Sequence, residues 1–513
     1  MPSSMVVSTQ KGATIHPLRR RPVNVPRCMS TQHPDNVQIP FFADHPVIQG
    51  ETEIKEAYYA YSHLGCTEQM WDYEGKEVDH FVVKKLLSRY EQFFRKRRLG
   101  TDLFLTLRVP NPRVERAEAK VLLETLESIP RSYDAARLFY GDGAPPPIFE
   151  VILPMTTDAR ELNRVYHYYR EFVGGKERQR CFDVSVGDWV GDFRPDKVNV
   201  IPLIEDREHL LRADRIVAEY LQGKEIEYQR VFLARSDPAL NYGLVSAVLL
   251  AKVALARLGR QEKRLGVDIL PILGVGSAPF RGNFVPARVG ETLAEYPSVQ
   301  TFTIQSAFKY DHEEEQVRAA IQHINRSARG EPQEVEEERC IEIIARVSAR
   351  YAECVRALAP LVNGVARYVP PRRARKLHIG LFGYSRRLDG HDTHLPRAIK
   401  FCAAMYSLGI PPEILGFSAL DSSDLAFVRT TYRKLERDMA DALRYLNEDN
   451  LPYLPPLIRR EVKQVREWLP CEPNEEHREA TGRIMRALQG GVEESSTLTE
   501  GIAKAASVRQ FLG

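Results

Sequence analysis

Short apolar segments alternate with longer amphipathic ones along most of this chain, and this alternation constrains the fold more than any other feature. The apolar runs are β-branched or leucine-rich, which is typical of strands buried on both faces of a parallel sheet. Eight runs are candidate strands: residues 23–31, 103–110, 148–154, 198–205, 229–237, 267–274, 299–307 and 376–384. Strand–helix alternation repeated eight times predicts an α/β fold, a TIM-like (β/α)8 barrel.

Helices are expected wherever apolar residues recur at three- to four-residue spacing. The clearest candidates between strands are residues 207–221, 243–258, 313–325 and 338–361. We expect additional α-helices to be inserted after the first strand, at residues 51–98. More are expected to be appended after the eighth, at 395–408, 421–446 and beyond, with a weak helix or a mobile tail from residue 490 onwards.

Composition indicates an ordinary globular protein of the cytoplasm. The 513 residues are 43% hydrophobic and carry a formal net charge of only +3, so nothing in the charge calls for nucleic acid or an anionic membrane as a partner. No apolar run approaches the roughly 18 residues that a membrane-spanning helix needs. The seven cysteines are scattered without a CxxC pair, which argues against a disulfide framework or a cysteine zinc site.

The first 28 residues differ in charge from the rest. No Asp or Glu occurs before Pro34, whereas Lys11, Arg27 and three consecutive arginines at 19–21 are present. An organellar transit peptide has this composition, but the pattern also fits a flexible basic extension or a start codon placed ahead of Met29. We interpret residues 1–28 as a flexible basic extension and residues 29–513 as a single catalytic domain.

Polar residues of an unusual kind follow the candidate strands. In a (β/α)8 barrel, the chemistry sits at the carboxyl ends of the strands. The residues at these positions are His33, Arg108, Arg113, Thr156, Glu205, Arg235, Asp237, a glycine-rich loop from Gly274 to Arg281, Gln305, Lys309, Arg386 and Arg387.

This set predicts a particular chemistry. Two carboxylates, with water and substrate oxygens, suit Mg²⁺, arginines bind phosphate and carboxylate bidentately, and one histidine can move a proton near neutral pH. Together they suit a small phosphorylated acid and a metal-stabilised enolate.

Each residue taken alone also has a structural interpretation. Glu205 or Asp237 can cap a helix, a single arginine can form a surface ion pair, and His33 beside Pro34 can be a packed turn residue. The loop at Gly274 lacks the GxGxxG spacing and no GxxxxGK[ST] motif occurs, so a nucleotide site is poorly supported. The i, i+3 histidines of 391–394 can bind metal, but a helix N-cap in this segment is the preferred interpretation.

Three motifs resemble the archaeal-type phosphoenolpyruvate carboxylases. They are Ser30-Thr-Gln-His-Pro-Asp-Asn36, Ala57-Tyr-Tyr-Ala-Tyr-Ser-His-Leu-Gly-Cys66 and Trp71-Asp-Tyr-Glu-Gly-Lys-Glu-Val78. The resemblance runs from about Met29 to the end of the sequence. It extends at scattered motifs to the larger bacterial and plant enzymes. It implies that His33 is the catalytic base, that Glu205 and Asp237 hold the metal, and that Arg108 and Arg386 bind substrate.

Two departures from the larger enzymes concern basic residues. The larger enzymes have a loop with two arginines. In this chain only the second is retained, as Arg281, which the resemblance implies is catalytic, and Val275 stands at the position of the first. Leu240 replaces a lysine that follows the metal aspartate. The arginines that could supply the missing contact are Arg113, Arg235 and Arg387.

The resemblance implies a magnesium-dependent reaction, with Mn²⁺ able to substitute, of phosphoenolpyruvate and bicarbonate to oxaloacetate and phosphate. Carboxyphosphate and the pyruvate enolate are the implied intermediates, and a cytoplasmic homotetramer is the implied assembly. An alternative is another metal-dependent phosphoenolpyruvate or pyruvate barrel lyase. A non-enzymatic alternative is a helical scaffold with a degenerate barrel.

Overall fold

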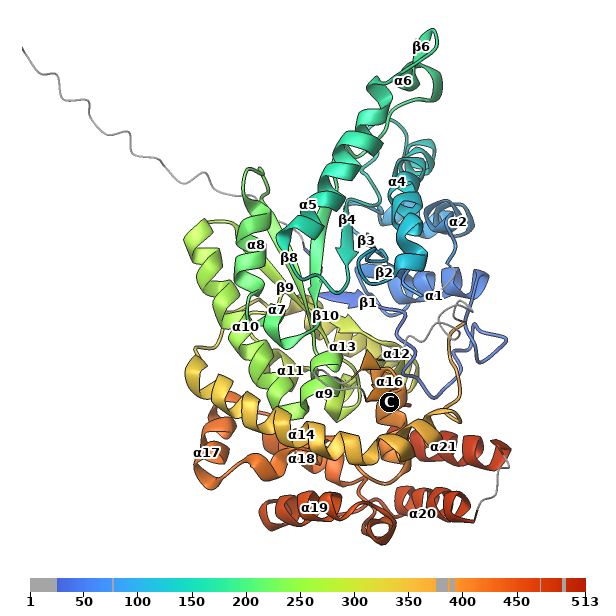
Figure 1. Cartoon of the computed structure of the whole chain (residues 1–513). Coiled ribbons are helices and arrows are strands. Elements are labelled where there is room, and N and C mark those ends of the chain that lie inside the picture. Colours follow the sequence, from blue (N-terminus) through green and yellow to red (C-terminus); the bar gives the residue numbers. More distant parts are fainter. Residues whose placement is uncertain (1–24, 76–77, 375–385, 388–392, 471, 491–494) are drawn as a thin grey trace, which may run out of the picture.

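The computed structural model describes residues 25–75, 78–374, 386–387, 393–470, 472–490 and 495–513 (Figure 1). Its centre is a closed barrel in which every neighbouring pair of strands is parallel, in the order β1-β10-β9-β8-β7-β4-β3-β2. The strands are β1 (Cys28–Ser30), β2 (Glu68–Asp72), β3 (Phe104–Arg108), β4 (Glu150–Leu153), β7 (Asn199–Ile204), β8 (Tyr228–Ala234), β9 (Asp268–Gly274) and β10 (Thr301–Ile304). The predicted TIM-like barrel is confirmed.

One strand differs from the prediction. β2 (Glu68–Asp72) lies inside the segment expected to hold only inserted helices, and it pairs with β1 and β3. The candidate strand at residues 376–384 lies outside the described residues, and the barrel closes without it because β1 pairs with β10. Arg108 therefore ends the third strand of the barrel, β3, and not the second.

The barrel begins within the predicted basic extension. Arg27 donates hydrogen bonds to the carbonyls of Val299 and Gln300, at 2.6 and 2.8 Å, and Cys28 opens β1. Residues 25–28 therefore belong with the barrel rather than with the extension. Residues 1–24 lie outside the described part of the chain.

Helices surround the barrel in the expected places. The predicted helix at 207–221 is split into α7 (Arg207–Leu210) and α8 (Ala213–Leu221), and those at 243–258 and 313–325 are α10 (Leu244–Leu265) and α13 (Glu314–Arg326). The others on the barrel are α1 (Glu51–Ser62), α2 (Val82–Arg89), α3 (Glu91–Lys96), α4 (Ala119–Tyr140), α5 (Ala159–Tyr168), α9 (Ser236–Tyr242), α11 (Val289–Glu295) and α12 (Ser306–Tyr310). Among the described residues, no helix is both long and apolar enough to cross a membrane.

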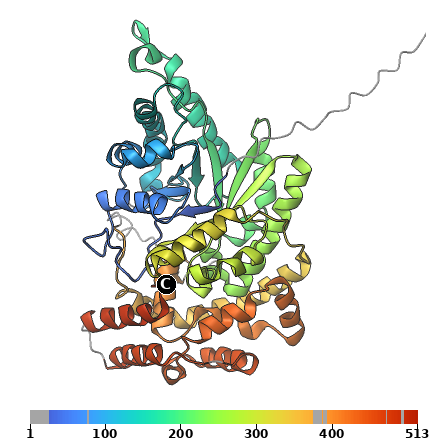
Figure 2. The same cartoon turned by 180° about the vertical axis from the view of Figure 1, so that it is seen from behind.

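The appended helices form a separate layer at one end of the barrel (Figures 1 and 2). They are α14 (Glu337–Ala366), α16 (Ala398–Ser407), α17 (Ser422–Thr431), α18 (Leu435–Leu443), α19 (Pro456–Trp468), α20 (Glu475–Gln489) and α21 (Ser495–Arg509). α14 contacts α10 of the barrel and α16 of the layer, so the long helix joins the two parts. The end of the sequence is not the expected weak helix or mobile tail: α21 packs on α20, and Phe511 and Leu512 are buried.

An arm projects from the other end of the molecule (Figure 1). It continues α5 through residues 169–178 into the hairpin β5 (Arg180–Cys181) and β6 (Val184–Ser185) and the short helix α6 (Val186–Val190). Large apolar side chains are exposed along it, among them Phe182 at 96% and Trp189 at 68%.

The barrel interior contains a charged layer and an apolar layer. Arg230 of β8 is fully buried and donates to both carboxylate oxygens of Glu68, each at 2.7 Å, and to Glu150 at 3.1 Å. Towards the carboxyl ends of the strands, an apolar cluster that includes Phe232 and Ala234 fills the interior. These two layers fill the barrel interior, so a ligand site is expected only at the carboxyl ends of the strands.

Candidate active site

A cavity of about 670 Å³ lies at the carboxyl ends of the barrel strands. Residues from the loop after β1 and from the ends of β2, β3, β7, β8, β9 and β10 line it on the barrel side. Residues 369–374, the start of α16 and Leu512 line it on the side of the helical layer. The cavity is therefore assembled between strand ends and appended segments, and its size suits a small-molecule ligand.

His33 lies in the wall of this cavity, three residues after β1. Its Nδ1 is 2.9 Å from the hydroxyl of Thr31. Desolvation by the surrounding protein lowers the pKa of His33 well below 6.5, and the positive charge of Arg108 lowers it further. The imidazole is therefore neutral at physiological pH and able to accept a proton.

Glu205 and Asp237 follow neighbouring strands. Glu205 comes directly after β7, Asp237 lies in the first turn of α9 after β8, and both side chains line the cavity. The capping alternative does not apply, because Asp206 caps α7 and Arg235 occupies the N-cap position of α9. Among the described residues, no group of three or more His, Cys, Asp or Glu could hold a metal ion. Two carboxylates that line one cavity are a donor set that fits Mg²⁺, which usually keeps several waters and binds through one or two carboxylates.

Arg108 and Arg281 are the two predicted arginines with the most defined surroundings. Arg108 ends β3 and lies beside Glu74, with which it forms an ion pair, and 3.5 Å from Asp72. Arg281 is 2% exposed and donates to Asp35 at 3.0 Å. Both guanidinium groups are held in fixed positions at the cavity.

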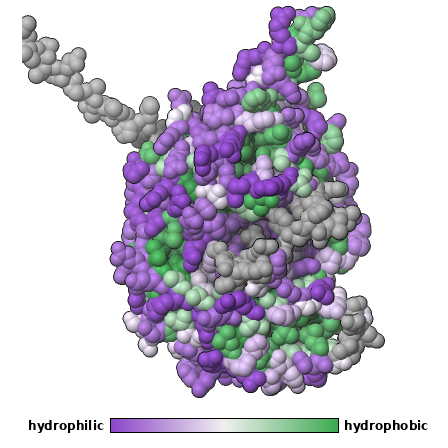
Figure 3. All heavy atoms as spheres, in the orientation of Figure 1, coloured by the Kyte–Doolittle hydropathy of each residue, from purple (hydrophilic) through white to green (hydrophobic). Residues whose placement is uncertain are grey.

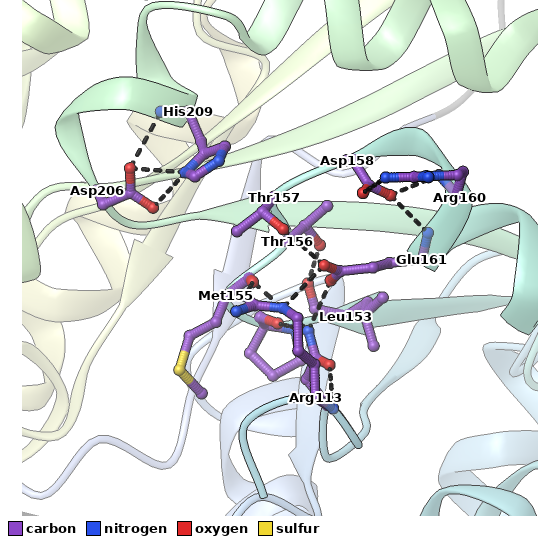
Figure 4. A network of polar contacts seen from close by, with 12 residues as sticks. Arg113, Leu153, Met155, Thr156, Thr157, Asp158, Arg160, Glu161, Asp206 and His209 are labelled. Carbon is purple, nitrogen blue, oxygen red and sulfur yellow. Dashed lines mark hydrogen bonds and ion pairs between the residues drawn. The ribbon is translucent and has the colours of Figure 1, made fainter.

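The other predicted arginines differ in whether they line the cavity. Arg235 lines it, and its Nη1 donates a long hydrogen bond of 3.5 Å to the Phe280 carbonyl. Arg113 does not line it: its guanidinium pairs with Glu161 at 2.9 Å and with the Met155 carbonyl at 2.7 Å (Figure 4). This result removes Arg113 as the replacement for the arginine missing at Val275.

Four further positions were singled out from the sequence. Arg386 and Arg387 form β11, which pairs with β12 (His394–Leu395), and their side chains lie outside the described part of the structure. Val275 and Leu240 are fully buried in the apolar core, so these two positions contribute no charge to the cavity.

Several cavity residues were not identified from the sequence. On the barrel side these are Asp72 and Glu74, which follow from the missed strand β2. The basic residues on the helical side are Arg372, Arg373, Arg397 and Lys400. The motif Trp71-Asp-Tyr-Glu-Gly-Lys-Glu-Val78 was the available signal, because it contains Asp72 at the end of β2 and Glu74 just after it.

The last residues of the sequence also reach the cavity. Leu512 lines it, and its backbone N–H donates to the Asp35 carbonyl at 2.7 Å. The Gly513 carbonyl accepts a hydrogen bond of 2.6 Å from Arg281. Arg509 anchors this segment from α21 by donating to the Leu512 carbonyl at 3.2 Å. The appended helices therefore help to position a predicted catalytic arginine.

Comparisons with known proteins identify the family to which this chain is similar. The family model described as phosphoenolpyruvate carboxylase matches residues 25–513. A phosphoenolpyruvate carboxylase of Methanothermobacter thermautotrophicus is 56% identical over 96% of this chain and 100% of its own. Those of Methanospirillum hungatei and Pyrococcus horikoshii are 52% and 48% identical over 96% and 95% of this chain, and each is covered completely.

Proposed function

Because the chain belongs to the phosphoenolpyruvate carboxylase family and is an enzyme of that family, we propose that it catalyses the magnesium-dependent carboxylation of phosphoenolpyruvate by bicarbonate, giving oxaloacetate and phosphate. One observation carries the proposal. A neutral histidine, two carboxylates from neighbouring strands and several guanidinium groups line the same cavity. This combination suits a substrate that is a phosphate ester and a carboxylate at once.

Glu205 and Asp237 would hold the magnesium ion, with water and substrate oxygens completing its coordination. The ion would supply positive charge to the substrate oxygen that becomes anionic when phosphate is transferred. Mn²⁺ is expected to substitute because it accepts the same oxygen ligands.

Arg108 and Arg281 would orient the two anionic substrates. Arg108 is placed for the phosphate or carboxylate of phosphoenolpyruvate, and Arg281 for bicarbonate and the carboxyphosphate formed from it. Arg235, Arg386 and Arg387 remain candidates for further substrate contacts. Fixed guanidinium groups are useful for this orientation, because bicarbonate must attack phosphorus in line with the leaving oxygen.

His33 would act as the base that accepts the proton of carboxyphosphate as it decomposes to CO₂. Its lowered pKa keeps the ring unprotonated, which this role requires. The cavity walls would limit the access of water, so that the enolate is carboxylated rather than protonated to pyruvate.

A coupled assay tests the proposal. Purified protein is given phosphoenolpyruvate and Mg²⁺, and oxaloacetate is measured by its reduction with malate dehydrogenase and NADH, with and without bicarbonate. Bicarbonate-dependent oxaloacetate is the expected result. Release of pyruvate with no requirement for bicarbonate would instead indicate the alternative barrel lyase.

We also infer a cytoplasmic homotetramer that replenishes oxaloacetate. The arm supports self-association because its apolar side chains Phe172, Phe182, Trp189 and Val190 are exposed. Figure 3 shows hydrophobic surface beside hydrophilic surface on the projecting arm. Between residues 176 and 197, five basic residues are balanced by five acidic ones. A neutral surface of mixed sign can pair with a copy of itself. Sedimentation of a Phe182→Asp, Trp189→Asp variant tests this: a lower mass is expected, and an unchanged mass would exclude the arm as an interface.

A further inference from the structure

Thr31 is a fully buried residue that directly follows β1 and lies two positions before His33. Its hydroxyl oxygen is 2.9 Å from Nδ1 of His33. His33 lines the cavity whereas Thr31 does not, so the hydroxyl group can act on a substrate only through the imidazole ring. Because Nδ1 is engaged with the protein, Nε2 is the ring nitrogen left for a ligand.

We propose that Thr31 is a positioning residue that accepts a hydrogen bond from the Nδ1–H group of His33 and thereby presents Nε2 to the cavity as the proton acceptor. The inference rests on the function proposed above, and it names the atom of His33 that performs the proposed step. A neutral imidazole carries one proton, and the nitrogen that lacks this proton is the base. A hydroxyl oxygen beside Nδ1 can accept from Nδ1–H, which leaves the lone pair on Nε2.

Hydrogen bonds to neighbouring elements fix the backbone on both sides of this contact. The Thr31 N–H donates to the carbonyl of Ile304, the last residue of β10, at 3.0 Å. The Thr31 carbonyl accepts a hydrogen bond of 2.9 Å from Nζ of Lys309. The His33 carbonyl accepts one of 3.3 Å from the N–H of Ser306, which begins α12. Since the main chain is held at these points, the hydroxyl group and the ring are kept in register with each other.

Lys309 is the support of this arrangement rather than a ligand for substrate. It is buried in α12 and does not line the cavity. Besides the Thr31 carbonyl, its Nζ donates to the carboxylate of Glu56 at 3.0 Å and to the hydroxyl of Ser30 at 3.1 Å. An ammonium group has three donors, and these three partners use all of them. Lys309 therefore holds the end of β1 in place beneath His33.

The opposite hydrogen bond, in which the Thr31 hydroxyl donates to Nδ1, would place the ring proton on Nε2 and remove the base from the cavity. In the proposed step, Nε2 takes the hydroxyl proton of carboxyphosphate. The bond between its carbon and the bridging oxygen then breaks to give CO₂ and phosphate, and the enolate forms a carbon–carbon bond with CO₂. Carboxyphosphate that escapes this step hydrolyses to bicarbonate and phosphate, and the enolate takes up a proton to become pyruvate. The ratio of oxaloacetate to pyruvate therefore reports on the orientation of His33.

Two substitutions at Thr31 separate the hydroxyl group from the shape of the side chain. Thr31→Val keeps the shape and removes the oxygen, whereas Thr31→Ser keeps the oxygen and removes a methyl group from a fully buried position. In Thr31→Val, oxaloacetate formation should fall about 10- to 100-fold, a part of what a positioned acid–base group contributes, with pyruvate formed instead. The KM for phosphoenolpyruvate should change less than about threefold, because Thr31 does not line the cavity.

Thr31→Ser should recover the product ratio to within about threefold of the wild type, because the hydrogen-bond acceptor is retained. A purely structural role of Thr31 would reverse the order of the two variants. Serine would then be the more damaging replacement, since the lost methyl group leaves a void in the core.

The tautomer of His33 is a readout that does not depend on turnover. Nitrogen-15 NMR spectra of protein with labelled histidine, assigned with His33→Asn, should show the Nδ1–H form of His33 in the wild type and in Thr31→Ser. Thr31→Val should show a mixture with the Nε2–H form, because Nδ1–H has lost its acceptor. Thr125→Val is the matched control, since the hydroxyl of this buried threonine donates to the Val121 carbonyl within α4. Neither the tautomer nor the product ratio should change in that control.

The outcomes separate this inference from the proposed function. If the wild type forms no oxaloacetate, the proposed function fails, whereas the spectra still test the hydrogen bond. The Nε2–H form of His33 in the wild type would overturn the inference. A product ratio in Thr31→Val within about threefold of the wild type, a greater loss in Thr31→Ser, or an equal change in Thr125→Val would overturn it as well.

A double variant shows whether Thr31 acts through His33. Adding Thr31→Val to His33→Asn should leave the product ratio of His33→Asn unchanged, because the two residues work as a unit. A further loss of the same size as in Thr31→Val alone would mean that Thr31 acts elsewhere, and the positioning role would be wrong.

Discussion

Glu413 is a buried acid whose substitution should stabilise the protein in a pH-dependent way. It lies in the short helical turn Pro412–Ile414, is 1% exposed and accepts a hydrogen bond from the hydroxyl of Tyr406. Its Oε2 has no hydrogen-bond partner among the described residues. Burial raises the pKa of Glu413 from 4.5 to about 7, and the hydrogen bond from Tyr406 offsets part of this effect.

The sign and size of the effect follow from proton linkage. Between pH 4.5 and about 7, the folded state retains a proton that the unfolded chain has released, so the free energy of unfolding falls as pH rises. With these two pKa values, the ionisation of Glu413 lowers the free energy of unfolding by about 1 kcal/mol at pH 5.5 and by about 3 kcal/mol at pH 8. Glu413→Gln does not titrate, keeps an acceptor for Tyr406 and should escape this loss of stability.

Equilibrium urea unfolding at pH 5.5 and pH 8 measures the difference. The free energy of unfolding of Glu413→Gln, relative to the wild type, should increase by about 2 kcal/mol from the lower to the higher pH. Glu461→Gln is the control with the opposite sign, because the buried carboxylate of Glu461 accepts hydrogen bonds from Arg350 and Ser418, and its loss should destabilise the protein. A difference for Glu413→Gln that does not change with pH, or a loss of stability at pH 8, would refute the reasoning.

Three further predictions concern the site and the barrel. His33→Asn should lower oxaloacetate formation by roughly 10²–10⁴-fold, whereas bicarbonate-dependent phosphate release should be less affected and the enolate should end as pyruvate. Parallel assays of phosphate, pyruvate and oxaloacetate, beside a thermal melt, check this. A near wild-type rate of oxaloacetate formation would remove His33 from the mechanism. Asp237→Asn should abolish activity at ordinary Mg²⁺ and leave the melt unchanged; titration with Mg²⁺ tests it, and an unaltered metal dependence contradicts it. Arg230→Met should cost about 3–5 kcal/mol in urea unfolding because Glu68 and Glu150 lose their buried counter-charge, and adding Glu68→Gln and Glu150→Gln should restore most of the loss; no loss in the single variant would show that the layer is not held by charge.

The barrel could be predicted from the sequence because most of its strands are continuously apolar. β2 could not, and the reason is physical. Its first residues are Glu68 and Gln69, which are both fully buried. The ion-pair partner of Glu68 is Arg230, which lies 162 residues later in the sequence. Gln69 donates a hydrogen bond to the carbonyl of Met70. A strand whose buried polar groups are satisfied through the tertiary fold has no apolar signal of its own.

The residues of the cavity could likewise be predicted only in part, because the sequence indicates which residues follow a strand but not where each side chain points. The rule that chemistry follows barrel strands singled out His33, Arg108, Glu205 and Asp237, and all four residues line one cavity. Arg113 obeys the same rule in sequence but its side chain pairs with Glu161, because the direction of a loop side chain is decided by the tertiary fold.

The helical layer contributes residues that no strand-end rule could find. Arg397 and Leu512 reach the cavity only because α16 and α21 pack against each other across the barrel mouth. Nη1 of Arg281 donates both to Asp35, in the loop after β1, and to the Gly513 carbonyl, so its position depends on the barrel and on the appended layer at once. A substitution that loosens α21, such as Arg509→Ala, should therefore change the kinetics of a site whose predicted metal ligands it does not touch. In the proposed reaction, residues at the strand ends of the barrel would bind the metal and transfer the proton, and the appended layer would help to hold Arg281 for an anionic substrate.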